Sequence, residues 1–170
     1  MSIASITPRE TVAGIVVRAA EPYPLIAAHW PEKAAECWQG NLSTAGGGIQ
    51  PGETAAQAML RELMEEYGVV EADVFPLQHP DWVYHGKRYH WCLVVCRTVP
   101  TPLEARDGVR SVGWYASPVC LKTAVREMSD SKKHMFINAL SIAMRLDPPL
   151  FGAYKRYARR RSVTEVAVHA

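Results

Sequence analysis

The sequence predicts an α/β domain in which helices pack on a β-sheet, and three observations support this prediction. Runs of β-branched and apolar residues, typical of buried strands, occur near the N-terminus and again at residues 88–99. Residues 55–67 are rich in strong helix formers, and residues 131–146 place apolar side chains at helical spacing before a Pro-Pro pair. Strands mixed with two substantial helices are typical of a sheet covered by helices.

The strands are predicted from their composition and from the turns between them. They lie at residues 11–18, 24–30, 73–78, 88–99 and 111–115. The first two would form a hairpin across the turn at Glu21-Pro22. The fourth is apolar on both faces, which predicts a central strand that is covered on both sides. Residues 79–81 are predicted as a turn and residues 100–108 as a loop.

The helix at residues 55–67 carries sequence signals at both ends. Thr54 and Gln57 have the spacing of a capping box, and Gly68 stands where a left-handed C-terminal cap belongs. On a helical wheel of about 100° per residue, one arc is apolar and is predicted to face the core. That arc holds Ala56, Met59, Leu60, Leu63 and Tyr67. A separate arc beside it holds Glu62, Glu65 and Glu66.

The composition is that of an ordinary globular protein. With 170 residues, 48% hydrophobic and 21% charged, the chain predicts one domain whose core needs no disulfide support. The net charge of +2 is too small to indicate nucleic-acid or membrane binding by itself. The first ten residues lack a signal-peptide pattern, and no window has the roughly 20 apolar residues of a spanning helix. The four cysteines lack metal-binding spacing. We therefore expect a cytoplasmic protein with buried thiols and no membrane partner.

The glutamates on the helix at residues 55–67 need an explanation beyond packing. Glu62 and Glu66 are a like-charge pair at i,i+4, which destabilises a helix by about 0.2–0.5 kcal/mol. A solvated acidic face is one explanation of such a cluster. Hard carboxylate oxygens on one face also suit Mg²⁺ or Mn²⁺, which bind substrate phosphates. Glu53 can reach the same site from the preceding loop. The cluster therefore indicates metal-dependent hydrolysis of a phosphoanhydride.

The spacing around these glutamates resembles the Nudix box. Gly47 is followed after five residues by Glu53, and after seven more by the run Arg61-Glu62-Leu63-Met64-Glu65-Glu66-Tyr67-Gly68-Val69, which satisfies every fixed position. The chain is thus similar to the Nudix hydrolases, over about residues 11–146. This resemblance implies an α/β/α sandwich with a mixed β-sheet, against which the box packs as a loop–helix–loop. We expect residues 1–150 to form this domain and residues 151–170 to form a basic C-terminal helix or tail.

The resemblance also implies roles for the box residues. The metal ligands would be Glu62, Glu65 and Glu66. Glu53 would be a further ligand or would support the ligands from behind, and Arg61 would orient the carboxylates without touching substrate. Gly47 and Gly68 would serve backbone geometry. The metal would neutralise phosphate oxygens and activate a water, whose proton a carboxylate must then remove.

The general base and one phosphate contact stay open. Glu62 is the candidate base within the box, while Asp107 and Glu104 are candidates from the loop before the last predicted strand. His29 ends the second predicted strand where many members of the family carry an arginine that contacts phosphate. Ala45 stands where many members have proline.

The substrate is predicted as a nucleoside diphosphate linked to another group. The segment GGIQPGE and the later Asp107-Gly108…Trp114 are similar to RNA 5′-pyrophosphohydrolases and dinucleoside polyphosphate hydrolases, so the first expectation is a (di)nucleoside polyphosphate or an RNA 5′-triphosphate. The alternatives are ADP-ribose, NADH or a nucleotide sugar, or a nucleotide-binding module without turnover. The predicted base-stacking residues are Trp82, Tyr84 and Tyr89, with Trp30 and Trp38 as further candidates and core packing as the alternative. The basic residues 155–161 could hold RNA or polyphosphate by charge, and an oligomer is left open.

Overall fold

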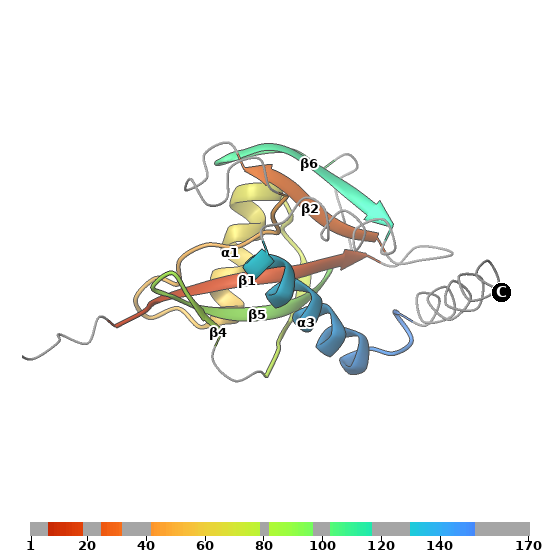
Figure 1. The fold of residues 1–170 in the computed structure, drawn as a ribbon. Coiled ribbons are helices and arrows are strands. Elements are labelled where there is room, and N and C mark those ends of the chain that lie inside the picture. Colours follow the sequence, from red (N-terminus) through yellow and green to blue (C-terminus); the bar gives the residue numbers. More distant parts are fainter. Residues whose placement is uncertain are drawn as a thin grey trace, which may run out of the picture.

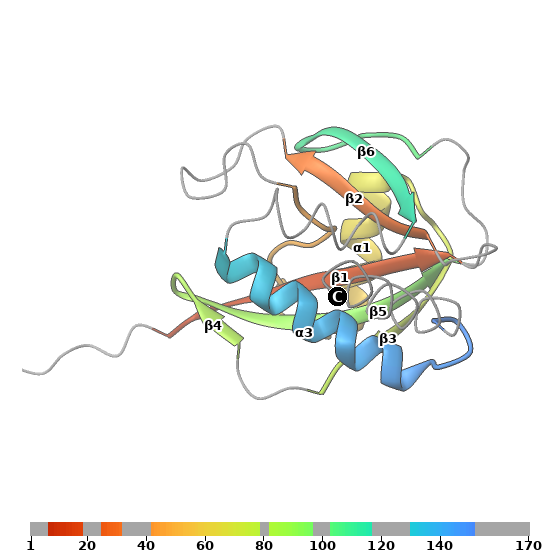
Figure 2. The same cartoon turned by 45° about the vertical axis from the view of Figure 1, so that its right-hand side comes forward.

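Two helices enclose a mixed sheet in the computed structural model (Figures 1 and 2). The structure describes residues 7–18, 25–31, 42–78, 82–96, 103–116 and 130–151. Within these residues α1 (Ala55–Tyr67) packs on one face of the sheet and α3 (Asp130–Leu146) on the other. The strands are β1 (Arg9–Arg18), β2 (Leu25–Pro31), β3 (Ala72–Pro76), β4 (Trp82–Tyr84), β5 (Lys87–Cys96) and β6 (Val109–Ala116). The predicted α/β/α sandwich is therefore confirmed.

The strand order is β3-β5-β1-β2-β6, and β4 pairs with β5 beside this path. β1 and β5 run parallel, in register from Arg9↔Lys87 to Val17↔Val95, whereas all the other pairs are antiparallel. β5 lies between β1 and β3 and is mostly buried, as expected of a strand covered on both sides. Its described part ends at Cys96, so the last residues of the predicted strand fall outside the described residues.

β1 and β2 pair as the predicted hairpin, but only at Val17↔Ile26 and Arg18↔Leu25. Further along, a later segment lies between them and forms single bridges to each, His29↔Ser43 and Thr11↔Gly48. We call residues 45–49 the glycine segment. Three hydrogen bonds join it to β1, with N···O distances between 2.8 and 3.1 Å. The box loop is therefore part of the sheet before the chain turns into α1.

Successive residues of β1 and β5 face opposite helices, as the period of a strand requires. One core cluster, on the α3 side, includes Ile15, Trp91, Leu93 and Phe136; the other, on the α1 side, includes Val12, Val16, Cys92, Val94, Met59, Leu63 and Tyr67. Cys92 and Cys96 are buried as expected, and burial raises their pKa to about 12 and about 11 respectively. Such thiols stay protonated and act as small apolar side chains.

α1 has the predicted bounds and caps, but its buried face differs from the prediction. Thr54 and Gln57 form the capping box, and Gly68 closes the helix with a φ of 68°. The predicted apolar arc is wrong at Leu60, which is 38% exposed, while Ala58 is buried instead. The buried side is therefore rotated toward the half-buried Glu62 and Glu66. Backbone and arginine partners in the glycine segment and box explain why carboxylates can face the protein here.

β4 was not predicted. It forms a hairpin with β5 through His85 and Gly86, whose φ values of 48° and 69° are typical of a type I′ turn. Histidine is a weak sequence signal for this turn, since asparagine or aspartate is usual before the glycine. The predicted turn at residues 79–81, Trp38 and the basic residues 155–161 lie outside the described residues. Among the described helices, none is long and apolar enough to cross a membrane.

Candidate active site

The glycine segment links β1 to the charged edge of α1 through alternate residues. Val12 N donates to Gly47 O on the β1 side, at 2.8 Å. The neighbouring residues direct their backbone the other way: Gly46 N donates to Glu66 Oε2 at 3.0 Å, and Gly48 O accepts from Arg61 Nη2 at 2.9 Å. This alternation is that of an extended chain. The box helix is therefore held along the outer edge of the glycine segment.

Two glycines in this segment are required by close approach. Gly46 has a φ of 155°, and a Cβ there would lie 2.3 Å from Val12 O. A Cβ on Gly47 would lie 2.2 Å from Glu62 Oε1. Because the Glu62 carboxylate occupies the space beside Gly47, the first glycine of the box makes room for a functional group and needs no positive φ.

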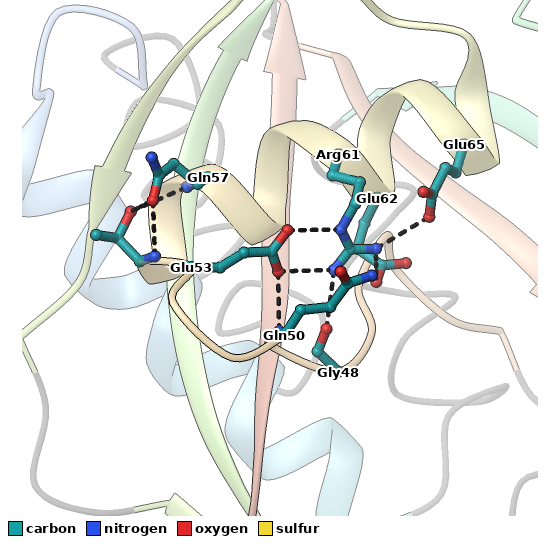
Figure 3. Close-up of polar contacts among 8 residues, drawn as sticks. Gly48, Gln50, Glu53, Gln57, Arg61, Glu62 and Glu65 are labelled. Carbon is teal, nitrogen blue, oxygen red and sulfur yellow. Dashed lines mark hydrogen bonds and ion pairs between the residues drawn. The ribbon is translucent and has the colours of Figure 1, made fainter.

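Arg61 is the centre of the polar contacts shown in Figure 3. Its guanidinium binds Glu53 with two parallel hydrogen bonds, Nε to Oε1 at 2.8 Å and Nη2 to Oε2 at 3.0 Å. Nη1 also donates to Glu62 Oε1 at 2.7 Å and to Glu65 Oε2 at 3.0 Å. Gln50 N donates to Glu53 from the loop, at 2.9 Å. One planar cation thus fixes three carboxylates from the loop and the helix.

These contacts divide the carboxylates by proton affinity. The hydrogen bond with Arg61 is the main cause that lowers the pKa of Glu53 below its usual value. Burial raises the pKa of Glu62 despite the opposing effect of Arg61. The same hydrogen bonds, first of all that with Glu53, raise the pKa of Arg61 above its usual value. Glu62 is therefore the carboxylate with an enhanced tendency to hold a proton.

The donor set fits a hard divalent cation. The candidate ligands are all carboxylates, and Glu62 is buried enough to have its ionised form disfavoured, which a nearby dication would reverse. In the described ranges, no three Asp, Glu, His or Cys side chains surround a common point. Arg61 lies among the oxygens of Glu53, Glu62 and Glu65 instead. A cation held by Glu62 and Glu65 would share their oxygens with this guanidinium.

The loop before β6 lies against the last turn of α1. Arg106 N donates to Glu66 O at 3.1 Å, and the Arg106 guanidinium covers Gly68. Glu104 is exposed and forms an ion pair with Arg106. Asp107 is exposed as well, and among the described residues no hydrogen bond joins it to the box glutamates. The structure thus brings the loop to the helix without placing Asp107 on the carboxylates.

A buried pair that sequence reasoning missed fastens the end of α1 to β2. His29 is 4% exposed, and its Nδ1 lies 2.7 Å from the hydroxyl of Tyr67, which is fully buried. The two rings meet edge to face. No local sequence signal connects residues 38 positions apart. Because the imidazole is enclosed beneath α1, it is not placed to contact a phosphate as an exposed arginine would.

We expect Tyr67→Phe to lower the free energy of unfolding by about 1 kcal/mol, since it removes one buried hydrogen bond and keeps the ring. Urea denaturation measures the change. Tyr115→Phe is the matched control, because Tyr115 is only partly buried on the other side of the sheet. Equal effects of the two substitutions would contradict a stabilising role for the His29–Tyr67 bond.

The three predicted base-stacking residues lie together, on the face of the sheet opposite α1. Trp82 and Tyr89 are cross-strand partners, and Tyr84 lies further along β4. All three are half-buried and pack against the α3-side core, where the rings of Trp82 and Trp91 are 6.2 Å apart. Trp30 lies on the same face, with the guanidinium of Arg110 over its ring. These aromatic residues therefore contribute to the core while keeping part of their surface exposed.

Comparison with known proteins identifies the class to which this fold and site belong. The family model described as the NUDIX domain matches residues 7–128. The chain belongs to this family. Its site assignment confirms the predicted enzyme class, a Nudix pyrophosphohydrolase acting on nucleoside diphosphate derivatives. No curated protein sequence gives a significant match.

Solved structures show the same fold at low sequence identity. The NUDIX domain of Shewanella oneidensis NrtR, complexed with ADP ribose, is 16% identical, with a TM-score of 0.62 over 82% of this chain and 89% of that one. A Caenorhabditis elegans Ap4A hydrolase is 15% identical, with a TM-score of 0.57 over 78% and 98%. The Francisella tularensis bifunctional NMN adenylyltransferase/ADP ribose pyrophosphatase, complexed with AMP and a Mn ion, is 23% identical, with a TM-score of 0.56 over 76% and 40%.

Proposed function

We propose that this protein hydrolyses a phosphoanhydride bond in a (di)nucleoside polyphosphate or in an RNA 5′-triphosphate, with Mg²⁺ or Mn²⁺ held by the box carboxylates. The observation that carries the proposal is the arrangement around Arg61, where carboxylates from the loop and from α1 meet beside the glycine segment. One of these carboxylates, Glu62, is half-buried and has a raised pKa. Such perturbed groups are typical of functional sites.

The residues of the chain would divide the work as follows. The metal ligands are Glu62, Glu65 and Glu66, with Glu53 as a further ligand or a support. A bound dication would neutralise phosphate oxygens and lower the pKa of a bound water. Arg61 keeps the carboxylates in place, since its planar guanidinium binds Glu53 at two points while it reaches Glu62 and Glu65.

Two side chains are candidates for the general base. Glu62 is the better placed, because burial has already raised its proton affinity and a base must accept the proton of the attacking water. Asp107 is the second candidate, carried by a loop whose backbone binds the last turn of α1. Replacing each by its amide would distinguish them, since loss of the base lowers kcat by about 10²–10⁴-fold.

The neighbouring structures support a nucleotide ligand and keep the alternatives specific. Complexes with ADP ribose and with AMP and a Mn ion occur among them, and one neighbour is an Ap4A hydrolase. ADP-ribose, NADH and nucleotide sugars are therefore the alternative substrates. A nucleotide-binding module without turnover is the alternative from a different class. The intact set of box glutamates favours the enzyme.

A substrate panel tests the proposal directly. The purified protein would be incubated with Mg²⁺ and with NTPs, diadenosine polyphosphates, ADP-ribose, NADH, nucleotide sugars and 5′-triphosphorylated RNA, and the nucleotide and phosphate products would be measured. We expect turnover of polyphosphates or of 5′-triphosphorylated RNA above that of the other compounds. Binding without product from any compound would support the non-catalytic module instead.

The raised pKa of Glu62 predicts a pH dependence of stability in the metal-free protein. Because the folded state binds this proton more tightly than the unfolded chain, Glu62 adds stability as the pH falls from above its folded pKa to the ordinary value of 4.5. At higher pH that contribution is absent. Urea unfolding over a pH series should show it in the wild type and not in Glu62→Gln. Mg²⁺ should weaken it, since a dication favours the ionised carboxylate.

Other proposals concern the whole chain. We propose that residues 1–150 form the catalytic domain and that residues 151–170 are a basic helix or tail, in a cytoplasmic protein. Comparing a chain that ends at residue 150 with the full chain in the same panel would test whether the tail affects activity toward RNA.

A further inference from the structure

Two cross-strand rows of side chains occupy the α3-side face of the sheet, at the start of β1. The first row contains Tyr84, Lys87 and Arg9, which are direct partners across β4, β5 and β1. The second row contains Trp82, Tyr89, Thr11 and Gly48, across the same strands and the glycine segment. The start of β1 and the β4–β5 hairpin lie at the same end of the molecule in both views (Figures 1 and 2). A pair of cations therefore adjoins a pair of aromatic rings.

The cation pair is not neutralised. Within the described residues, neither Arg9 nor Lys87 forms an ion pair or a side-chain hydrogen bond. The opposite face of the same strands differs. There Arg88 Nη1 donates to Glu10 Oε1 at 3.0 Å, and His90 Nε2 lies 2.5 Å from Glu10 Oε2. One face thus pairs its cation with a carboxylate, and the other places two cations side by side.

Like charges directly opposite each other in a sheet are destabilising, and neighbouring strands are only about 4.8 Å apart. Two adjacent cations without a carboxylate are typical of a site that is completed by an anion. Guanidinium and ammonium groups are the two side chains that commonly bind phosphate. The anion that this pair would accept is therefore a phosphate.

Arg9 is also in contact with the box. Its Nη2 lies where a Cβ on Gly48 would be only 2.6 Å away, so the guanidinium packs on this glycine. On the preceding residue, the corresponding position of Gly47 is filled by the carboxylate of Glu62. Arg9 and Glu62 thus lie against consecutive residues of the glycine segment. A phosphate chain at the carboxylates would begin one residue away from the guanidinium.

We infer that Arg9 and Lys87 form a phosphate-binding subsite for the part of the substrate beyond the bond that is cleaved, with Trp82 and Tyr89 beside it. This inference deepens the proposed function, on which it rests for the identity of the anion as the substrate's own phosphate chain. It assigns the substrate to compounds with three or more phosphates in a row. ADP-ribose and NADH, with two phosphates, would leave one cation without a partner.

Binding of inorganic tripolyphosphate tests the subsite independently of turnover. Isothermal titration calorimetry with EDTA and low salt would compare the wild type with Arg9→Gln, Lys87→Gln and the double variant. We expect about 10-fold weaker binding for each single substitution, the size of one lost charge-assisted contact, and no measurable binding for the double variant. Arg145→Gln, on the last turn of α3, is the charge-matched control and should bind as the wild type does.

Folding is unlikely to confuse the result with loss of structure if unfolding is measured alongside, and the midpoint of each Arg9 or Lys87 variant should equal or exceed that of the wild type, because repulsion is relieved. Wild-type protein that fails to bind tripolyphosphate would overturn the inference. So would single variants that bind it as tightly as the wild type.

Kinetics separate this inference from the proposed function. For the polyphosphate hydrolysed fastest in the panel, Arg9→Gln should raise KM by about 10-fold with kcat nearly unchanged, because the contact is remote from the reacting bond. The rise should be smaller for ADP-ribose. Turnover with a KM that ignores Arg9 and Lys87 would refute the subsite alone. Tripolyphosphate binding that depends on both cations, in a protein that hydrolyses nothing in the panel, would refute the hydrolase and leave the anion site standing.

Discussion

Glu66→Gln is expected to lower kcat by on the order of 1,000-fold. Loss of a metal-ligating oxygen removes several kcal/mol of transition-state stabilisation, and each 1.4 kcal/mol corresponds to a factor of ten. The fold should be unchanged, because a glutamine can still accept the hydrogen bond from Gly46 N that Glu66 Oε2 now accepts at 3.0 Å. Steady-state kinetics would be combined with Mn²⁺ titration followed by electron paramagnetic resonance, which reports metal binding without turnover.

The matched control for this substitution is Glu71→Gln. Glu71 is exposed and lies beyond the end of α1, so the same change of charge occurs close to the helix but outside the site. It should keep wild-type activity and Mn²⁺ binding. Full activity in Glu66→Gln, or an equal loss in both variants, would show that the metal has been assigned to the wrong residues.

The sequence predicted well those features that depend on neighbouring residues. The bounds of α1 follow from a capping box and a terminal glycine, each of which satisfies backbone groups within a few residues. The motif from Gly47 to Val69 is equally local, and the family match confirms it. β5 was predicted as an interior strand because burial on both faces leaves a continuous apolar run.

Features that depend on tertiary contacts were not predictable. The orientation of α1 was mistaken at Leu60, because the glycine segment supplies polar partners that allow Glu62 and Glu66 to turn inward. The His29–Tyr67 bond joins β2 to α1 across 38 positions. The adjacency of Arg9 and Lys87 requires the parallel pairing of β1 with β5, which no single-sequence pattern specifies.

Arg61→Gln is expected to reduce both activity and stability. The guanidinium is only 20% exposed and contacts three carboxylates, so its removal leaves Glu53, Glu62 and Glu65 to repel one another in a partly desolvated place. We expect a loss of about 2–3 kcal/mol in unfolding free energy without divalent cations, somewhat below that of a fully buried pair. kcat should fall about 100-fold, because ligands that are no longer oriented lose transition-state interactions. Urea unfolding and steady-state kinetics measure the two effects.

Two comparisons separate orientation from charge at Arg61. Arg61→Lys keeps the charge but loses the planar fork that holds Glu53 at two points, so it should recover stability more than activity. Arg106→Gln removes an arginine from an exposed ion pair and should cost less than about 1 kcal/mol. Saturating Mg²⁺ should restore part of the stability of Arg61→Gln, since the cation takes over neutralisation of the glutamates. An Arg61→Lys variant with wild-type kcat would show that charge alone, rather than the geometry of the guanidinium, organises the carboxylates.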